Sequence, residues 1–223
     1  MAQPWKTLAT LSTDEGLIEL RQRGAKDFLI TVDGLVLMNS QQNRSEIALG
    51  KLGCEKIAGD LNPRVLVGGL GMGFTLKAVL DSLPEQAKVT VAELNPTVVE
   101  WCQGPLAVLT DTAVSDPRVT VAIEDVAKLV QRLAVQGEGF DAVVFDLYKG
   151  PHAKTDKVHD PLYGSHAIAN VAKILRPGGR FTVWGENYDE GFDRRLRQAG
   201  LTTMNKRPGK GGYRHVVFVA DRA

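Results

Sequence analysis

Three glycines and one carboxylate stand where they could hold a nucleoside. The run RVLVGGLGMGFTLKAV, residues 64–79, is apolar and β-branched at first and then contains Gly69, Gly71 and Gly73 before a helical pattern begins. Glycines at a strand-to-helix turn let the backbone approach a ligand closely, because no Cβ blocks it. A second apolar run, residues 89–92, ends in Glu93. A carboxylate at that point can accept hydrogen bonds from both hydroxyls of a ribose.

The spacing of the glycines narrows the class of cofactor. The dinucleotide motif G-x-G-x-x-G would need glycine at Phe74, whereas this chain reads G-x-G-x-G. An adenosine sulfonium cofactor fits this turn better than NAD, and we expect Met72 and Leu94 to lie against it. The alternative is an ordinary strand–helix–strand turn in which the glycines are incidental.

Further carboxylates follow the next two apolar runs. Glu124 and Asp125 come after the third run, and Asp146 comes after FDAVVF, residues 140–145. Ligands of parallel sheets bind beyond the carboxyl ends of the strands, so one cleft can contain all of these groups. For Asp146 the alternative is a buried acid that caps a loop or a helix.

The order of the elements predicts the fold class. Residues 1–40 form extended runs with a hairpin signal at Asp33-Gly34, so we expect an N-terminal antiparallel β meander and then a helix capped by Ser45 and running to about Ile57. Beyond Arg64, strands and helices alternate, which predicts an α/β fold with a mostly parallel sheet and helices on both faces. We expect residues 1–60 to form the meander with its linking helix and residues 61–223 a Rossmann-like catalytic domain. The expected strands are 64–68, 88–93, 118–123, 140–146, 179–185 and 214–220, and the expected helices are 73–82, 96–103, 124–136, 163–175 and 189–199.

Composition limits the partners. The formal net charge is +1, which gives no electrostatic case for binding nucleic acid or a membrane surface. No apolar run approaches the length of a transmembrane helix, and the N-terminal residues lack the pattern of a signal peptide. Cys54 and Cys102 lie far apart, as expected for reduced thiols. We therefore expect a cytoplasmic protein that acts on a small molecule.

Six segments resemble the spermidine synthases, the aminopropyltransferase branch of the class I S-adenosylmethionine-dependent methyltransferase fold. They are VDGLVLMNS, RVLVGGLGMGFTL, VTVAELNPTVVEW, DPRVTVAIEDV, FDAVVFDLYKGP and ILRPGGRFTVW, which together cover roughly residues 30–185. The resemblance implies polyamine biosynthesis as the setting and a homodimer as the assembly.

The resemblance also implies roles for individual residues. The glycine turn would hold the methionine-derived part of the cofactor, Glu93 the ribose and Asp125 the adenine amino group. Asp146 matches the acid that binds and deprotonates the attacking amine. An ammonium group must lose a proton before it can attack a carbon bonded to sulfonium, and a carboxylate can take that proton.

Three departures from the family pattern concern the substrate. Met72 stands where the family has an acid that favours decarboxylated S-adenosylmethionine over the intact cofactor. Lys149 replaces a carboxylate that would hold the second cationic end of a polyamine. The family's Tyr-His-Glu appears as Arg44-Ser45-Glu46, with only Glu46 matching. A cationic Lys149 suits a neutral or anionic acceptor better than putrescine.

These departures lead us to expect methyl transfer from S-adenosylmethionine to a small molecule, with Asp146 and Tyr148 orienting the acceptor. Glu46, Lys149 and Tyr163 are expected to contact that acceptor. The alternatives are aminopropyl transfer from decarboxylated S-adenosylmethionine, intramolecular displacement at the sulfonium, and a catalytically inactive cofactor-binding subunit.

The remaining histidine and tryptophan residues carry weaker signals. The intervals of seven between His152, His159 and His166 match no metal motif, so no metal is expected, although one of these imidazoles could act as a base beside Asp146. Trp101 and Trp184 fall in helical and strand patterns and are expected in the core.

Overall fold

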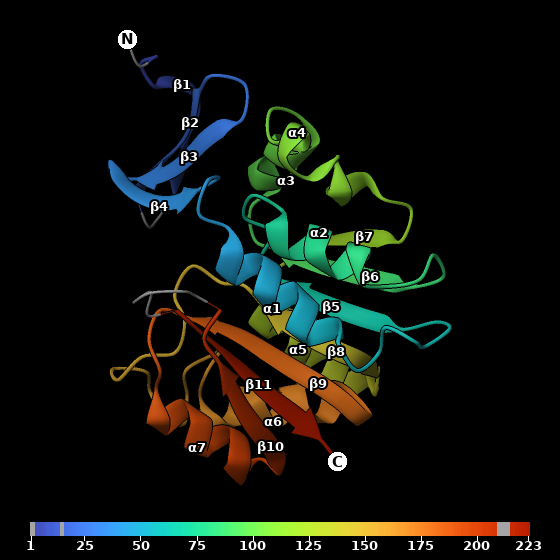
Figure 1. The fold of residues 1–223 in the computed structure, drawn as a ribbon. Helices are drawn as coiled ribbons and strands as arrows, with labels where there is room; N and C mark the ends of the chain where they lie inside the picture. The colour runs from blue at the N-terminus through green and yellow to red at the C-terminus, as the bar shows by residue number, and fades with distance from the viewer. Residues whose placement is uncertain (1–2, 14–15, 209–214) are drawn as a thin grey trace.

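The computed structural model describes residues 3–13, 16–208 and 215–223, which form two β-sheets and the helices that cover the larger one (Figure 1). Within these residues no helix is long and apolar enough to cross a membrane. The first sheet is antiparallel, in the order β1-β2-β3-β4. Its strands are β1 (Lys6–Thr13), β2 (Gly16–Arg23), β3 (Asp27–Val32) and β4 (Leu35–Asn39).

The turn between β3 and β4 confirms the hairpin signal. Asp33 and Gly34 both have positive φ, 48° and 78°, as a two-residue hairpin turn requires. The Asp33 carboxylate also accepts a hydrogen bond from the backbone N–H of Leu17 at 2.8 Å, which joins the turn to β2. One face of the sheet buries Leu20 and Phe28 completely.

The larger sheet has the order β10-β11-β9-β8-β5-β6-β7 in the described part of the chain. Strands β9, β8, β5, β6 and β7 are parallel, and β11 runs antiparallel to both of its neighbours, as the α/β prediction of a mostly parallel sheet requires. Its strands are β5 (Arg64–Gly68), β6 (Lys88–Glu93), β7 (Val119–Ile123), β8 (Phe140–Phe145), β9 (Leu175–Gly185), β10 (Leu201–Lys206) and β11 (Val216–Arg222).

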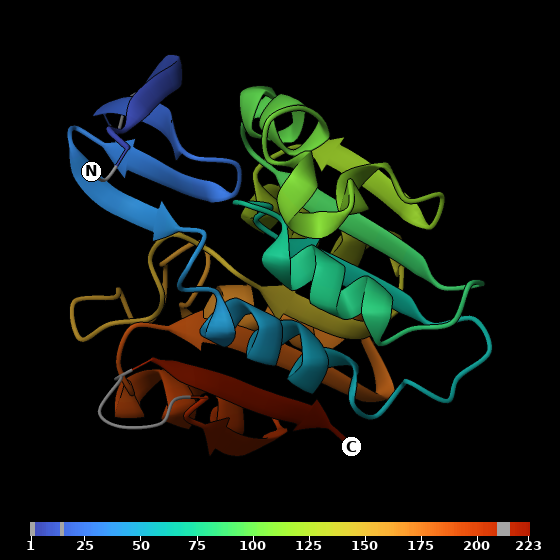
Figure 2. The same cartoon turned by 45° about the horizontal axis from the view of Figure 1, so that its top comes forward.

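Helices cover both faces of this sheet, and each face has its own core. Alternate side chains of β5 divide between the two cores, with Val65 and Val67 on one side and Leu66 on the other. Helices α1, α2 and α3 pack on the first face and α5, α6 and α7 on the second. Figure 1 shows α1 and α2 on the near side of the sheet and α5 on its far side, and Figure 2 again shows α1 and α2 on the near side. The helices are α1 (Arg44–Cys54), α2 (Phe74–Asp81), α3 (Pro96–Gln103), α4 (Ala107–Thr110), the 3₁₀ turn η1 (Ala113–Ser115), α5 (Val126–Gln136), α6 (Ser165–Ile174) and α7 (Glu190–Gln198).

Several boundaries differ from the sequence predictions. Ser45 does not cap α1, because the helix begins at Arg44 after Asn43, and it ends at Cys54 rather than at Ile57. Strand β10 and the short helices α4 and η1 were not predicted. Strand β10 has a polar, mostly exposed sequence, and only pairing with β11 marks it as a strand. The predicted start of the last strand, Arg214, lies outside the described residues.

Arg180 on β9 joins three elements beneath the first face. Its guanidinium, on a side chain only 3% exposed, makes two hydrogen bonds to the Asp221 carboxylate of β11 at 2.7 and 3.1 Å. It also donates to the Leu52 carbonyl of α1 at 3.0 Å and to Glu55 at 2.9 Å. The guanidinium therefore fixes the C-terminal end of α1 to the sheet.

We predict that Arg180→Met lowers the free energy of unfolding by about 3 kcal/mol, because it removes the buried partner of the Asp221 carboxylate and leaves only the half-exposed Lys56 beside it. Denaturant titration measures this change. As a control, Arg23→Met removes a half-exposed ion pair with Asp27 and should cost less than about 1 kcal/mol. Equal losses in the two variants would contradict the role given to Arg180.

Candidate active site

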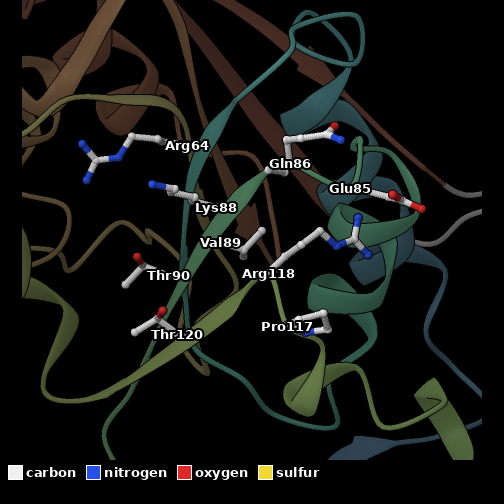
Figure 3. Close-up of a pocket in the computed structure, with 10 residues that line it drawn as sticks. Arg64, Glu85, Gln86, Lys88, Val89, Thr90, Pro117, Arg118 and Thr120 are labelled. Atoms are coloured by element: carbon white, nitrogen blue, oxygen red, sulfur yellow. The ribbon is translucent and has the colours of Figure 1, made fainter.

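Two cavities lie at opposite ends of the parallel strands. The first, about 720 Å³, is at the amino ends of β5 and β6. Figure 3 shows Arg64 and Lys88 extending to one side of it and Arg118 toward Glu85 on the other. Both arginines have structural partners: Arg64 pairs with Glu138 at 2.7 Å, and Arg118 pairs with Asp116 at 2.8 Å. We therefore do not regard this cavity as the active site.

The second cavity, about 620 Å³, lies at the carboxyl ends of the strands, and its volume is typical of small-molecule sites. Side chains of the N-terminal sheet form much of its apolar wall. It brings together most of the residues that the sequence predicts for the site: Glu46, Gly69, Gly71, Glu93, Leu94, Asp125, Asp146, Tyr148 and Lys149.

The turn after β5 needs glycine at two of its positions. Gly69 and Gly71 have φ values of 86° and 51°, in the left-handed region. A Cβ at Gly69 would lie 2.2 Å from the carbonyl oxygen of Asp146, and one at Gly71 would lie 2.8 Å from the terminal methyl carbon of Met38. The turn therefore follows the adjacent strand end closely and leaves its backbone exposed to the cavity.

Glu93, at the end of β6, fastens this turn. One carboxylate oxygen accepts the N–H of Leu70 at 2.9 Å, and the other accepts the N–H of Asn95 at 2.9 Å. Burial raises the pKa of Glu93, and these backbone hydrogen bonds oppose the rise. Each carboxylate oxygen has a second lone pair, so Glu93 can still accept hydrogen bonds from a ligand in the cavity.

Glu124 and Asp125 are neighbours in sequence but point to different surroundings. Asp125 lines the cavity and caps α5, where its carboxylate accepts the N–H of Lys128 at 3.1 Å. Glu124 pairs with Arg132 at 2.8 Å and is absent from the lining.

Asp146, at the end of β8, is the acid in the cavity whose pKa is shifted most. Its carboxylate accepts a hydrogen bond from the Thr75 hydroxyl at 2.5 Å. Burial and, to a smaller extent, the negative charge of Glu46 raise the pKa of Asp146 to about 7, against the hydrogen bond from Thr75, which lowers it. Part of the residue remains open to the cavity, so this carboxyl group can exchange its proton with a ligand near neutral pH.

Three other predicted residues are not in the lining of this cavity. Met72 is 1% exposed and packs in the hydrophobic core of the first face. Gly73 is the residue that precedes α2 and faces Thr110. Tyr163 is buried, and its hydroxyl donates to the carbonyl of Lys149 at 2.7 Å, so it supports the loop after β8 from beneath. Burial raises the pKa of Tyr163.

Several side chains in or beside this cavity were not predicted from the sequence. Thr75 reaches Asp146 from the first turn of α2, and Trp184 lies next to the end of β9, where the strand-end rule could have indicated it. Trp101 is a core residue as expected, but both tryptophans also contact the cavity. The sheet β1–β4 contributes Thr13, Ile18, Ile30, Val32, Leu37 and Met38.

Other reactive side chains lie elsewhere. His152, His159 and His166 are not among the lining residues, and the rings of His159 and His166 pack edge to face. In the described ranges no group of three or more His, Cys, Asp and Glu side chains is arranged to hold a metal ion. Both cysteines are buried and unbridged, and burial raises the pKa of each thiol to about 12.

Comparisons with solved structures show the fold. A spermidine synthase from Thermotoga maritima superposes with a TM-score of 0.74 at 19% identity, over 98% of this chain and 73% of that one. A spermidine synthase in complex with the transition state analogue AdoDATO gives 0.72 at 18% identity, over the same shares of the two chains.

Sequence relatives carry the name polyamine aminopropyltransferase. The protein of Shewanella oneidensis is 31% identical over 131 residues, which is 54% of this chain and 22% of the relative. That of Mycobacterium tuberculosis is 34% identical over 119 residues, 53% and 22% of the two chains. That of Pyrobaculum neutrophilum is 31% identical over 132 residues, 58% and 44%. The alignments therefore span less than half the length of these three relatives.

The family resemblance seen in the sequence motifs is confirmed over most of the larger sheet. Residues 54–190, from the end of α1 to the start of α7, match the spermine/spermidine synthase domain. This chain belongs to the spermine/spermidine synthase domain family.

Proposed function

We propose that this chain is an aminopropyltransferase, which moves the aminopropyl group of decarboxylated S-adenosylmethionine to an acceptor amine. The observation that supports this most directly is Asp146, a carboxyl group at the strand ends with a pKa near 7 and a second carboxylate, Glu46, beside it. Such a pair attracts a cationic amine and can remove its proton. The names of the relatives agree with this reaction.

The nucleoside end of the cavity fits such a cosubstrate. Gly69 and Gly71 line the cavity in a turn that a Cβ at either position would force to shift, and Glu93 keeps lone pairs free for ribose hydroxyls. Asp125 can accept a hydrogen bond from an adenine amino group while it caps α5. Leu94, 70% exposed in this structure, offers an apolar surface beside Glu93 for the base.

At the other end, the side chains of this protein hold the acceptor amine and take its proton. The cosubstrate supplies an electrophilic carbon bonded to sulfonium. When the amine nitrogen attacks that carbon, a C–N bond forms, the C–S bond breaks and its electron pair stays on sulfur. Asp146 takes the proton that nitrogen loses, and Thr75 holds the carboxylate in place through their hydrogen bond. We assign Tyr148, at the exposed rim, to orienting the acceptor.

The comparisons favour this reaction over methyl transfer, the first expectation from the sequence. That expectation relied on the missing acid at Met72 and on the positive charge of Lys149. The side chain of Met72 lies in the core, and the cavity retains four carboxylates, Glu46, Glu93, Asp125 and Asp146. A cationic aminopropyl group therefore still finds negative charge there.

The positive charge of Lys149 argues against a simple diamine as the acceptor. Its ammonium group lies 5.1 Å from the centre of the Tyr148 ring, and among the described residues it makes no ion pair with a carboxylate. A second ammonium on the acceptor would meet a like charge at this side of the cavity. We propose an acceptor with one amine and a neutral or anionic remainder.

We predict that Asp146→Asn lowers kcat at least 100-fold, about the contribution of a positioned general base, while binding of the nucleoside product, methylthioadenosine, is retained. Glu138→Gln, two residues before the opposite end of β8, serves as the control with unchanged rate. Product formation is followed by mass spectrometry and binding by calorimetry. A variant Asp146→Asn with nearly full kcat would contradict the base. Wild-type protein that binds methylthioadenosine but converts no amine would indicate an inactive cofactor-binding subunit.

The reaction should also depend on pH through Asp146. Because only the ionised carboxylate can take a proton, we expect kcat/KM to rise with pH up to an apparent pKa of about 7 and to fall about tenfold per unit below it. Glu46→Gln removes a negative neighbour and should lower this apparent pKa, whereas Thr75→Val removes a hydrogen bond to the carboxylate and should raise it. Shifts in the same direction for both variants would refute the assignment to Asp146.

Charge reversal tests the acceptor. We predict that Lys149→Asp raises the kcat/KM ratio of a diamine over its monoamine analogue at least tenfold, which corresponds to about 1.4 kcal/mol. Lys154→Glu makes a comparable change at an exposed position of the same loop outside the cavity lining and should leave the ratio unchanged. An unchanged ratio in Lys149→Asp would remove Lys149 from the acceptor site.

A further inference from the structure

A cluster of four side chains stands at the Glu46 side of the cavity: Ser45 and Glu46 from the first turn of α1, Trp184 from β9, and His215, immediately before β11. The Ser45 hydroxyl donates to the Glu46 carboxylate at 2.6 Å. The same hydroxyl oxygen lies 3.3 Å from Nδ1 of His215. The imidazole packs edge to face on Trp184, with 5.0 Å between ring centres.

The single proton of the hydroxyl orders this chain of contacts. While Glu46 is ionised it can only accept, so the proton of Ser45 points to Glu46. The hydroxyl oxygen can then only accept from His215, and Nδ1 must carry a proton. The contacts therefore run from His215 Nδ1–H to Ser45 and from the Ser45 O–H to Glu46.

The residues around this cluster favour one orientation of the Glu46 carboxylate. Ser45 is 8% exposed, so its hydroxyl has little access to solvent for other partners. Glu46 and Trp184 both line the cavity, and Trp184 limits where the imidazole can lie. The residues involved come from both ends of the chain, and 170 positions separate Ser45 from His215.

We propose that His215 is a positioning residue, which acts through Ser45 to hold the Glu46 carboxylate in the cavity beside Asp146. The proposal rests on the proposed function for its catalytic consequence, namely that the two carboxylates bind the acceptor amine together. Without the imidazole, the Ser45 hydroxyl is free to turn and Glu46 loses its fixed direction. Acceptor binding should then weaken, and the effect of Glu46 on Asp146 should decrease.

Three substitutions at one position separate hydrogen bonding from packing. In His215→Asn the amide nitrogen is bonded to Cγ as Nδ1 is, so it can donate to Ser45. In His215→Gln the amide nitrogen takes the place of Nε2, and His215→Phe keeps a ring against Trp184 but has no donor. We expect His215→Asn to stay within about twofold of wild type in acceptor KM. We expect His215→Gln and His215→Phe to raise this KM at least fivefold, with a smaller change in kcat. Equal effects of all three would overturn the proposal in favour of a packing role.

A measurement without turnover keeps this test distinct from that of the proposed function. In ¹⁵N NMR spectra at about pH 9.5, where an imidazole is normally neutral, His215 should be protonated at Nδ1, and Ser45→Ala should change this. The ¹³C titration midpoint of the Asp146 carboxyl group should move to lower pH in Ser45→Ala and in His215→Phe but not in His215→Asn. An Nε2–H imidazole insensitive to Ser45→Ala, or an unmoved midpoint, would overturn the proposal. If no amine is converted while both signatures appear, the proposed function fails and the positioning contact stands.

Discussion

The turn after β5 has to fit against the ends of two neighbouring strands, and the rest of the site depends on that fit. Gly69 donates its N–H to the Ala92 carbonyl of β6, while a side chain on it would collide with the Asp146 backbone after β8. Glu93 then accepts the next N–H, that of Leu70. Because β6, β5 and β8 are adjacent parallel strands, this close contact brings the acids at their ends to one cavity.

The acids in that cavity differ in how their charge is stabilised, and this separates binding from proton transfer. Glu93 accepts backbone N–H groups on both oxygens, and Asp125 lies at the N-terminus of α5, where a negative charge is favoured. Burial and the negative charge of Glu46 raise the pKa of Asp146, and its one hydroxyl hydrogen bond, from Thr75, opposes this rise without cancelling it. Its proton therefore leaves only near pH 7. Carboxyl groups of one cavity are thus suited to hydrogen-bond acceptance at one end and to proton exchange at the other.

The residues that we assign to the nucleoside could be placed at one edge of the sheet from the sequence, because they lie in short, consecutive segments of the chain. Strand, glycine turn and terminal acid follow one another along the chain, and the parallel sheet then places Glu93, Asp125 and Asp146 at one edge. The same logic does not show where neighbouring side chains point, so Met72 and Glu124 were expected at the cavity and lie elsewhere. Strand β10 was missed because its polar residues form a strand only through pairing with β11. Contacts such as that of Thr75 with Asp146 depend on how the helices pack, and the spacing of residues in the sequence does not predict this packing.

The proposed acceptor end is built from distant parts of the chain, so family membership defines it less well. Its walls come from the N-terminal sheet, the first turn of α1, the loop after β8 and the end of β9. The family's imidazole is missing from the first turn of α1, yet His215 brings an imidazole to Ser45 from the other end of the chain. Substitutions in these segments can change the acceptor while the glycine turn and Glu93 stay intact. We propose that the charge of Lys149 is such a change, which alters the electrostatics of the cavity without disturbing the strand ends to which we assign the nucleoside.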